Sequence, residues 1–373
     1  MIYHDDFLDK KLQERTALNA FRKLSLPGEM TDFCSNDYLG IVKDNLLYAE
    51  KDTFKTGSGG SRLLAGNYPL IEQTENKIAT FHESPAALIF NSGYDANLGL
   101  LSCVPQRGDT IVYDSLSHAS LRDGLRLSLA QSFSFLHNDL TDLEKKLQLA
   151  GGNIFVVTES VFSMDGDRCP LQEMVQLAKQ YRAHLIIDEA HATGVIGEKG
   201  EGLVQHLQLH QEVFCRIHTF GKACGCHGAA VVGSLRLRDY LINFCRSFIY
   251  TTSLPEEAVA VISRSYDQFP AMICQRKKLV ELVNLFQSVP TGFEKSSSST
   301  PIQVVTVPGN DTVKKLAETL QQHRLDVRAI LYPTVPKGKE RLRIVLHAFN
   351  TRSELLELAE QLQKAYSSTP PGC

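Results

Sequence analysis

The sequence lacks the features that mark several classes of protein. No apolar run reaches the roughly 20 residues that cross a bilayer, and the N-terminal residues lack the cationic and apolar regions of a signal peptide. The net charge is −3, whereas proteins that bind nucleic acid usually carry an excess of positive charge. These absences predict a cytoplasmic protein with neither a membrane nor a nucleic-acid partner.

The cysteines form no recognisable framework. There are nine, dispersed along the chain, and no two of them are spaced as Cys-x-x-Cys. In a cytoplasmic chain this pattern is typical of reduced, mostly buried thiols. The sequence therefore predicts no structural disulfide and no metal site.

What the sequence does contain is an alternation of short apolar runs and helical patterns. The predicted strands cover residues 87–90, 110–113, 154–158, 185–188, 216–220 and 229–233, and helical spacing occupies segments such as 140–149 and 171–181. Most of these strands are apolar throughout, which is typical of parallel strands covered by helices on both faces. The pattern predicts a doubly wound α/β fold that binds its ligand at the carboxyl ends of the strands.

The length of 373 residues allows two domains with a large core. We expect an N-terminal helical segment at 1–35, a large domain at 36–270 and a small α+β domain at 271–373. The predicted small domain has a first helix at 272–287, a strand at 302–307, a helix at 312–323, strands at 327–330 and 341–347, and a closing helix from 351.

Two residues at strand ends carry the clearest chemical signal. The apolar run 185–187 ends in Asp188, and Lys222 follows the strand at 216–220 between Gly221 and Gly225. A carboxylate and an amine at the same ends of neighbouring buried strands suit pyridoxal 5'-phosphate (PLP). The lysine would form a Schiff base with the aldehyde, and the aspartate would keep the pyridine nitrogen protonated. The pair predicts amino-acid chemistry.

Other polar residues follow strands at the same predicted edge. Residues 91–94 (Asn-Ser-Gly-Tyr) open a helix after a strand, which aims free backbone N–H groups at an anion. Ser163 lies in the loop after the strand at 154–158, Thr219 precedes the lysine by three positions, and His118 follows the strand at 110–113. Each alone is more often a cap or a core residue, so their joint arrangement is the signal.

The tetrapeptide Asp188-Glu-Ala-His191 also matches the acidic motif of DEAH-type helicases. That function needs an upstream Gly-x-x-x-x-Gly-Lys-Ser/Thr loop to bind the phosphates. The sequence has no such loop, and its negative net charge disagrees as well. We therefore discard the nucleotide-hydrolase interpretation.

Nine segments carry a resemblance to a known family, the α-oxoamine synthases, which are PLP enzymes that condense a small amino acid with an acyl thioester and release carbon dioxide. Within it, the chain is most similar to the branch that makes 8-amino-7-oxononanoate for biotin. The segments are Ser35-Asn-Asp-Tyr-Leu-Gly40, Gly57-Ser-Gly-Gly-Ser-Arg-Leu-Leu-Ala-Gly-Asn67, Phe90-Asn-Ser-Gly-Tyr-Asp-Ala-Asn97, Ser117-His-Ala-Ser120, Ser160-Val-Phe-Ser-Met-Asp-Gly-Asp167, Asp188-Glu-Ala-His-Ala-Thr-Gly194, Thr219-Phe-Gly-Lys222, Phe248-Ile-Tyr-Thr-Thr252 and Arg341-Leu-Arg-Ile344.

The resemblance implies an aspartate-aminotransferase-like (fold type I) PLP-dependent transferase, with a role for each matching residue. Lys222 would carry PLP, Asp188 would pair with the pyridinium, and His118 would stack on the ring and polarise the thioester carbonyl. The remaining implied cofactor contacts are His191 and Ser163 near the phenolic oxygen, Gly93, Tyr94 and Thr219 on the phosphate side, and Thr251 and Thr252 reaching the phosphate of a neighbouring subunit. The last pair implies a homodimer with shared active sites.

For the substrates, the resemblance implies L-alanine and a pimeloyl thioester carried by coenzyme A or by an acyl carrier protein. Arg343 would bind the amino-acid carboxylate with Asn36 nearby, and Arg22 would contact the acyl substrate. One departure concerns the residues after Arg343. Asn350-Thr351 stands where the family often has a His-Thr pair, which affects substrate contacts and not the cofactor site.

Three alternatives remain open at the level of sequence. A sister enzyme would use glycine, as glycine C-acetyltransferases and 5-aminolevulinate synthases do. An aldolase or aminotransferase on the same scaffold would release neither carbon dioxide nor free thiol. A protein that only binds the cofactor would show no turnover at all.

Overall fold

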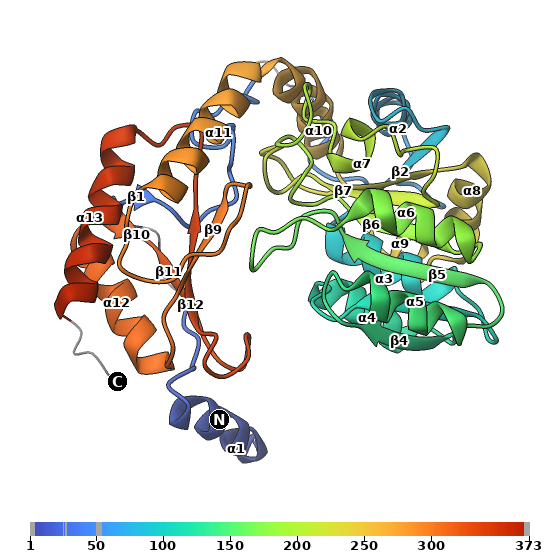
Figure 1. Cartoon of the computed structure of the whole chain (residues 1–373). Helices are drawn as coiled ribbons and strands as arrows, with labels where there is room; N and C mark the ends of the chain where they lie inside the picture. Colours follow the sequence, from blue (N-terminus) through green and yellow to red (C-terminus); the bar gives the residue numbers. More distant parts are fainter. Residues whose placement is uncertain (1–3, 25, 27, 50–53, 369–373) are drawn as a thin grey trace. The chain divides into compact units, whose positions relative to one another are not determined.

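A computed structural model describes residues 4–24, 26, 28–49 and 54–368 of the chain (Figure 1). The chain forms two compact units. The smaller unit combines Met1–Ser35, Met164–Gly166 and Lys278–Cys373, and the larger one combines Asn36–Ser163 and Asp167–Lys277. The predicted domains 1–35, 36–270 and 271–373 stay a prediction.

The larger unit is built on a seven-stranded sheet in the order β2-β8-β7-β6-β5-β3-β4. Only β8 runs antiparallel to its neighbours, so the predicted mainly parallel α/β fold is confirmed. The strands are β2 (Ala86–Phe90), β3 (Thr110–Asp114), β4 (Gln131–Phe135), β5 (Ile154–Glu159), β6 (His184–Asp188), β7 (Cys215–Thr219) and β8 (Ala229–Gly233).

Helices pack against this sheet, and the strands β2, β5, β6 and β8 are almost fully buried. This burial explains why the strands read as continuous apolar runs rather than alternating ones. The helices are α2 (Pro69–Phe81), α3 (Gly93–Cys103), α4 (Ala119–Leu127), α5 (Leu140–Gln148), α6 (Leu171–Gln180), α7 (Leu203–His206), α8 (Leu235–Phe244), α9 (Arg246–Ile249) and α10 (Glu256–Gln268), with a 3-10 turn η2 (Phe269–Ala271).

The smaller unit has its own core under a three-stranded antiparallel sheet in the order β11-β12-β9. The predicted strands and helices here are present within a few residues. They are α11 (Ile273–Ser288), which crosses the division between the units, β9 (Ile302–Thr306), α12 (Asn310–Gln322), β11 (Arg328–Ile330), β12 (Arg341–Val345) and α13 (Arg352–Ser368).

The N-terminal segment of the smaller unit has short elements. The turn η1 (Asp6–Leu8) leads into α1 (Asp9–Ala17), which has no buried residue, and β1 (Thr31–Asp32) pairs in parallel with β10 (Leu325–Asp326).

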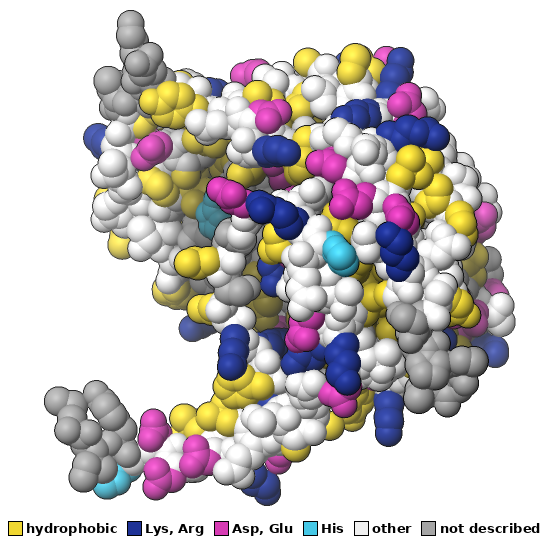
Figure 2. Space-filling view, turned by 90° about the vertical axis from the view of Figure 1, so that its left-hand side faces the viewer, with side chains coloured by type: hydrophobic (Ala, Val, Ile, Leu, Met, Phe, Trp, Pro, Cys, Tyr) yellow, Lys and Arg dark blue, Asp and Glu magenta, His cyan; other side chains and the backbone are white. Residues whose placement is uncertain are grey.

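On the face shown in Figure 2, Lys and Arg side chains are interspersed with Asp and Glu. Within the described ranges, no helix is long and apolar enough to span a bilayer.

Candidate active site

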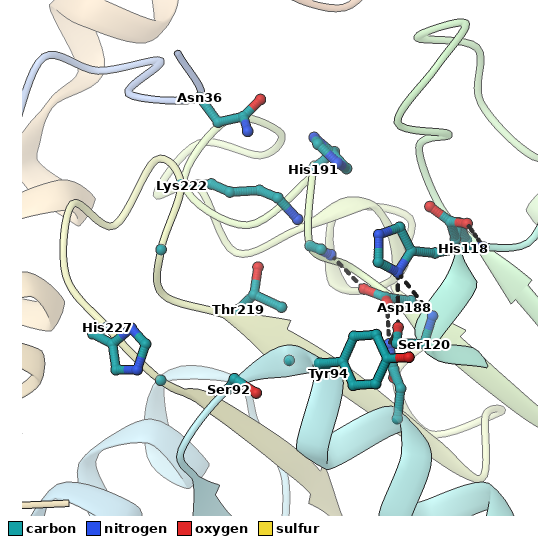
Figure 3. A pocket seen from close by; sticks show the side chains of 16 residues that line it. Asn36, Ser92, Tyr94, His118, Ser120, Asp188, His191, Thr219, Lys222 and His227 are labelled. Carbon is teal, nitrogen blue, oxygen red and sulfur yellow. Dashed lines mark hydrogen bonds between the residues drawn. The ribbon is translucent and has the colours of Figure 1, made fainter. Parts of the chain in front are cut away.

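A cavity of about 230 Å³ opens in the larger unit where β5, β6 and β7 end and α3 and α4 begin (Figure 3). This is the edge of the sheet at which an α/β fold binds its ligand. The residues that line it are Asn36, Ser92, Gly93, Tyr94, Asn97, His118, Ser120, Glu159, Asp188, Ala190, His191, Thr219, Gly221, Lys222, His227 and Gly228.

The carboxylate of Asp188 is buried and held from two sides. It is the last residue of β6 and only 4% exposed. Its Oδ1 accepts a hydrogen bond from the backbone N–H of Ala190 at 2.9 Å, and its Oδ2 accepts one from Asn97 Nδ2 at 2.7 Å. Asn97 reaches it from the middle of α3, so the helix and the strand together fix the carboxylate.

The same asparagine connects Asp188 to His118. Asn97 Nδ2 also lies 3.0 Å from Ser120 Oγ, and that hydroxyl lies 2.8 Å from Nδ1 of His118 (Figure 3). Burial lowers the pKa of His118; the Asp188 carboxylate opposes this shift and the Lys222 amine adds to it. A neutral imidazole can lie against an aromatic ring and donate or accept a proton there.

A second carboxyl group lies beside the first. Glu159 ends β5 and lies opposite Asp188 in the register of the sheet. Glu159 Oε1 accepts the backbone N–H of His118 at 2.7 Å. Burial, reinforced by the Asp188 charge, raises the pKa of Glu159 to about 8. A protonated Glu159 places no second negative charge beside the Asp188 side chain.

Lys222 sits in a tight turn between β7 and β8, and its side chain extends into the cavity (Figure 3). The turn is closed by hydrogen bonds from Gly225 N to Lys222 O and from Cys226 N to Phe220 O, both 2.9 Å long. Gly225 has a φ of +64°, and a Cβ there would lie 2.3 Å from Ile41 Cγ2. The glycine that follows the lysine is thus required by the turn itself.

Beside the start of α3, the cavity has the features of an anion site. Ser92 caps the helix by accepting the N–H of Asp95, which leaves the first N–H groups of the helix directed at the cavity. A Cβ on Gly93 would lie 2.4 Å from Thr219 Cγ2, so only glycine permits this approach. Oγ1 of Thr219 is buried and, among the described atoms, has no hydrogen-bond partner.

His191 lines the opposite rim and is held by a tyrosine. Its Nδ1 lies 2.7 Å from the hydroxyl of Tyr38, which donates to Asn36 Oδ1 at 3.2 Å. His191 and Tyr38 are both buried. The segment Ser35-Asn-Asp-Tyr-Leu-Gly40 thereby orients a histidine that the sequence places three residues after Asp188.

The structure brings most of the predicted site residues of this unit to the cavity, and three of them do not line it. Ser163 follows β5 in the larger unit but is absent from the cavity wall. Thr251 and Thr252 follow α9, where Asn91 Nδ2 donates to Thr251 Oγ1 at 3.0 Å and to the Thr252 carbonyl at 2.9 Å. Their predicted roles stay predictions.

The two predicted substrate arginines belong to the smaller unit. Arg22 is exposed and donates from Nη2 to Thr334 Oγ1 at 3.1 Å, and Arg343 lies half-buried on β12. The nearby departure from the family pattern has a structural role, because Asn350 Oδ1 accepts the backbone N–H of His347 at 2.8 Å. The carboxylate-binding role of Arg343 stays a prediction.

Four polar residues of the cavity wall were not predicted from the sequence as site residues: Asn97, Ser120, Glu159 and His227. Asn97 and Ser120 end two of the segments quoted above, and Glu159 ends a predicted strand, so their positions were visible although their roles were not. Among the described residues, no group of three His, Cys, Asp or Glu side chains could hold a metal ion.

Comparison with known proteins gives consistent matches. Residues 28–362 match the family model of aminotransferase class I and II. An 8-amino-7-oxononanoate synthase of Emericella nidulans is 41% identical and aligns over 96% of this chain and 94% of its own.

Two solved structures share the fold over nearly the whole chain. A serine palmitoyltransferase of S. paucimobilis with a bound adduct of PLP and myriocin has a TM-score of 0.89 and 26% identity, over 97% of each chain. An 8-amino-7-oxononanoate synthase of Francisella tularensis has a TM-score of 0.77 and 27% identity, over 91% of this chain and 98% of that one.

Proposed function

Because this chain belongs to the aminotransferase class I and II family, we propose that it makes 8-amino-7-oxononanoate in biotin synthesis. It would condense L-alanine with a pimeloyl thioester and release carbon dioxide and free thiol. Relatives described as 8-amino-7-oxononanoate synthases align over almost the full length of this chain. The observation that carries the proposal is one cavity that is lined by Lys222, by the hydrogen-bonded carboxylate of Asp188 and by the anion site at the start of α3.

The cofactor is PLP, and the residues present fit it. Lys222 offers an amine to its aldehyde, Asp188 offers an anion to its pyridine nitrogen, and Thr219 Oγ1 offers a buried hydroxyl without a partner to its phosphate. When bound, PLP withdraws electrons from the amino-acid Cα, which weakens the bonds from that carbon to hydrogen and to the carboxylate.

The reaction needs a base that removes the Cα proton of alanine. Lys222 is the residue of the cavity with a primary amine, and in its neutral form that amine would take the proton from Cα. His118 carries a lowered pKa because it is buried, so it is held neutral and able to donate a hydrogen bond from its Nε2 to the thioester carbonyl. The network through Ser120 fixes its tautomer and orientation.

Three residues are assigned to the substrates in this proposal. Arg343 binds the alanine carboxylate, since a guanidinium matches a carboxylate with two parallel hydrogen bonds. Asn36, at the rim of the cavity, lies on the amino-acid side, and Arg22 contacts the acyl donor. Ser163 and His191 would hold PLP on the side of its phenolic oxygen. The predicted cytoplasmic location stays a prediction.

The test of the function is a substrate panel. Purified protein with PLP is given alanine or glycine together with pimeloyl, acetyl or succinyl thioesters of coenzyme A, and a pimeloyl carrier protein is tried as well. Mass spectrometry should find 8-amino-7-oxononanoate with alanine and a pimeloyl donor. Turnover with glycine and a short acyl donor alone would instead assign the chain to the sister enzymes, and keto-acid formation without any thioester would assign it to the aminotransferases.

Replacing the lysine gives the first prediction. Lys222→Ala should lower turnover by roughly three orders of magnitude or more, because it removes both the covalent anchor and the base. The thermal unfolding temperature should change little, since the side chain is only half-buried. Lys10→Ala, an exposed change on α1, is the matched control and should keep full activity. A fully active Lys222→Ala protein would rule out this role.

A further inference from the structure

The phosphate side of the cavity contains a histidine that the function described so far does not use. His227 lies in the connection from β7 to β8, immediately before Gly228. Figure 3 shows it on the same side as Ser92 and Thr219, across the cavity from Asp188 and His118. Gly228 has a φ of +113°, and a Cβ there would lie 3.2 Å from the Phe90 carbonyl, so the glycine fixes the path of the chain at His227.

The charges of the described lining residues leave the phosphate side short of a cation. No arginine lines the cavity, and its single lysine is Lys222, whose amine is needed at the aldehyde. A phosphate monoester carries a charge of about −1.5 to −2 at neutral pH. The start of α3 and the hydroxyl of Thr219 supply hydrogen bonds and a partial positive charge, but neither is an ion.

The other two histidines of the cavity are engaged elsewhere. Nδ1 of His118 lies 2.8 Å from Ser120 Oγ, and Nδ1 of His191 lies 2.7 Å from the hydroxyl of Tyr38. Figure 3 places both of them away from Ser92 and Thr219. An imidazole beside a phosphate is stabilised in its protonated form and then donates charge-assisted hydrogen bonds.

We propose that His227 binds the phosphate of PLP and supplies the positive charge that the other cavity residues do not provide at that end. The inference rests on the proposed function, because it takes PLP as the ligand. It assigns His227 to cofactor binding and gives it no part in the chemistry at Cα. Its consequence is a preference for phosphorylated over unphosphorylated forms of the cofactor.

The test compares PLP with pyridoxal, which has the same ring and aldehyde but no phosphate. Apoprotein is titrated with each, and the dissociation constant is read from the absorbance of the bound chromophore in the absence of substrate. His227→Ala should weaken PLP binding roughly tenfold or more, as expected for a lost hydrogen bond to a charged group. It should leave pyridoxal binding unchanged within about twofold. His227→Arg should restore PLP binding.

His323→Ala is the control, because His323 is also exposed but lies on the smaller unit. An unchanged PLP affinity in His227→Ala would overturn the inference, as would an equal loss for PLP and pyridoxal. A loss selective for PLP that His227→Arg does not restore would overturn the cationic role. Since no substrate is present, protein that binds PLP selectively but makes no 8-amino-7-oxononanoate would refute the proposed function and leave this inference standing.

Discussion

The position of one carboxylate, that of Asp188, depends on a neutral amide. Asn97 Nδ2 donates to Asp188 Oδ2 at 2.7 Å and to Ser120 Oγ at 3.0 Å, and Asn97 is only 2% exposed. Its own Oδ1 is buried without a hydrogen-bond partner among the described atoms. The unpaired Oδ1 costs free energy of folding. We infer that this cost is tolerated because the two hydrogen bonds from Asn97 Nδ2 orient Asp188 and, through Ser120, His118.

Removing the amide of Asn97 should therefore weaken the cofactor site. Asn97→Ala takes one donor from a buried carboxylate, a loss worth roughly 1.5–3 kcal/mol for a hydrogen bond to a charged group. We expect the dissociation constant of PLP to rise roughly tenfold to a hundredfold, measured by absorbance titration of the apoprotein. Asn76→Ala, an exposed change on α2, should have no effect. Wild-type affinity in Asn97→Ala would show that the aspartate is held without it.

At the scale of the elements, His137 lies between two carboxylates and contacts the loop that contains Ser163. Nδ1 of His137 lies 3.0 Å from Asp114 Oδ1 at the end of β3, and its Nε2 lies 2.8 Å from Asp167 Oδ2. Although burial opposes the shift, hydrogen bonds to the two carboxylates raise the pKa of His137 to about 10. The charged histidine therefore links β3, the segment after β4 and the loop after β5.

This link predicts a dependence of stability on pH. The folded-state pKa is above the unfolded value of about 6.5, so the contribution of His137 is complete below about pH 6.5 and is lost as the pH rises through 10. The advantage of wild type over His137→Gln in the free energy of unfolding should thus shrink between pH 6.5 and 10. Urea unfolding with excess PLP measures it. For the control His206→Gln, an exposed change, the difference from wild type in the free energy of unfolding should not depend on pH. A difference for His137→Gln that is equally independent of pH would contradict the link.

The elements also show how far the sequence could predict the structure. The six predicted strands of the large sheet are present, and most of them are apolar runs that helices bury. β4 (Gln131–Phe135) was missed because it lies at the edge of the sheet, and four of its five residues are exposed. Its alternation of Ser and Phe is too short and polar to stand out from a loop.

At the site, the sequence identified the residues with reactive groups. It did not identify the residues that orient those groups or change their pKa. Lys222 and Asp188 were predicted because each follows a buried strand. Asn97 is a helix residue that contacts Asp188 across 91 positions of sequence, and the raised pKa of Glu159 depends first on its burial and then on its register with Asp188. Neither contact follows from a local pattern.

For the whole molecule, we propose a homodimer in which Thr251 and Thr252 would bind the phosphate in the neighbouring subunit. Thr251 accepts a hydrogen bond from Asn91, and a hydroxyl that accepts can still donate its own proton. Thr252 is exposed in the single chain. This arrangement requires each site to contain Lys222 from one subunit and the threonines from the other.

Mixing two inactive variants tests the sharing. Lys222→Ala and the double variant Thr251→Ala, Thr252→Ala are refolded or coexpressed together, so that mixed dimers form. One site of each mixed dimer is then intact, and random pairing in a twofold dimer should restore about a quarter of wild-type activity. Activity no greater than the sum of the separate variants would contradict shared sites.

The central claim, that Lys222 holds PLP, can be tested most directly by chemical trapping. The purified protein is incubated with PLP, reduced with borohydride, digested and sequenced by mass spectrometry. We predict a single phosphopyridoxyl modification, located on Lys222. Protein that takes up no label, or that carries it on another lysine, would contradict the account.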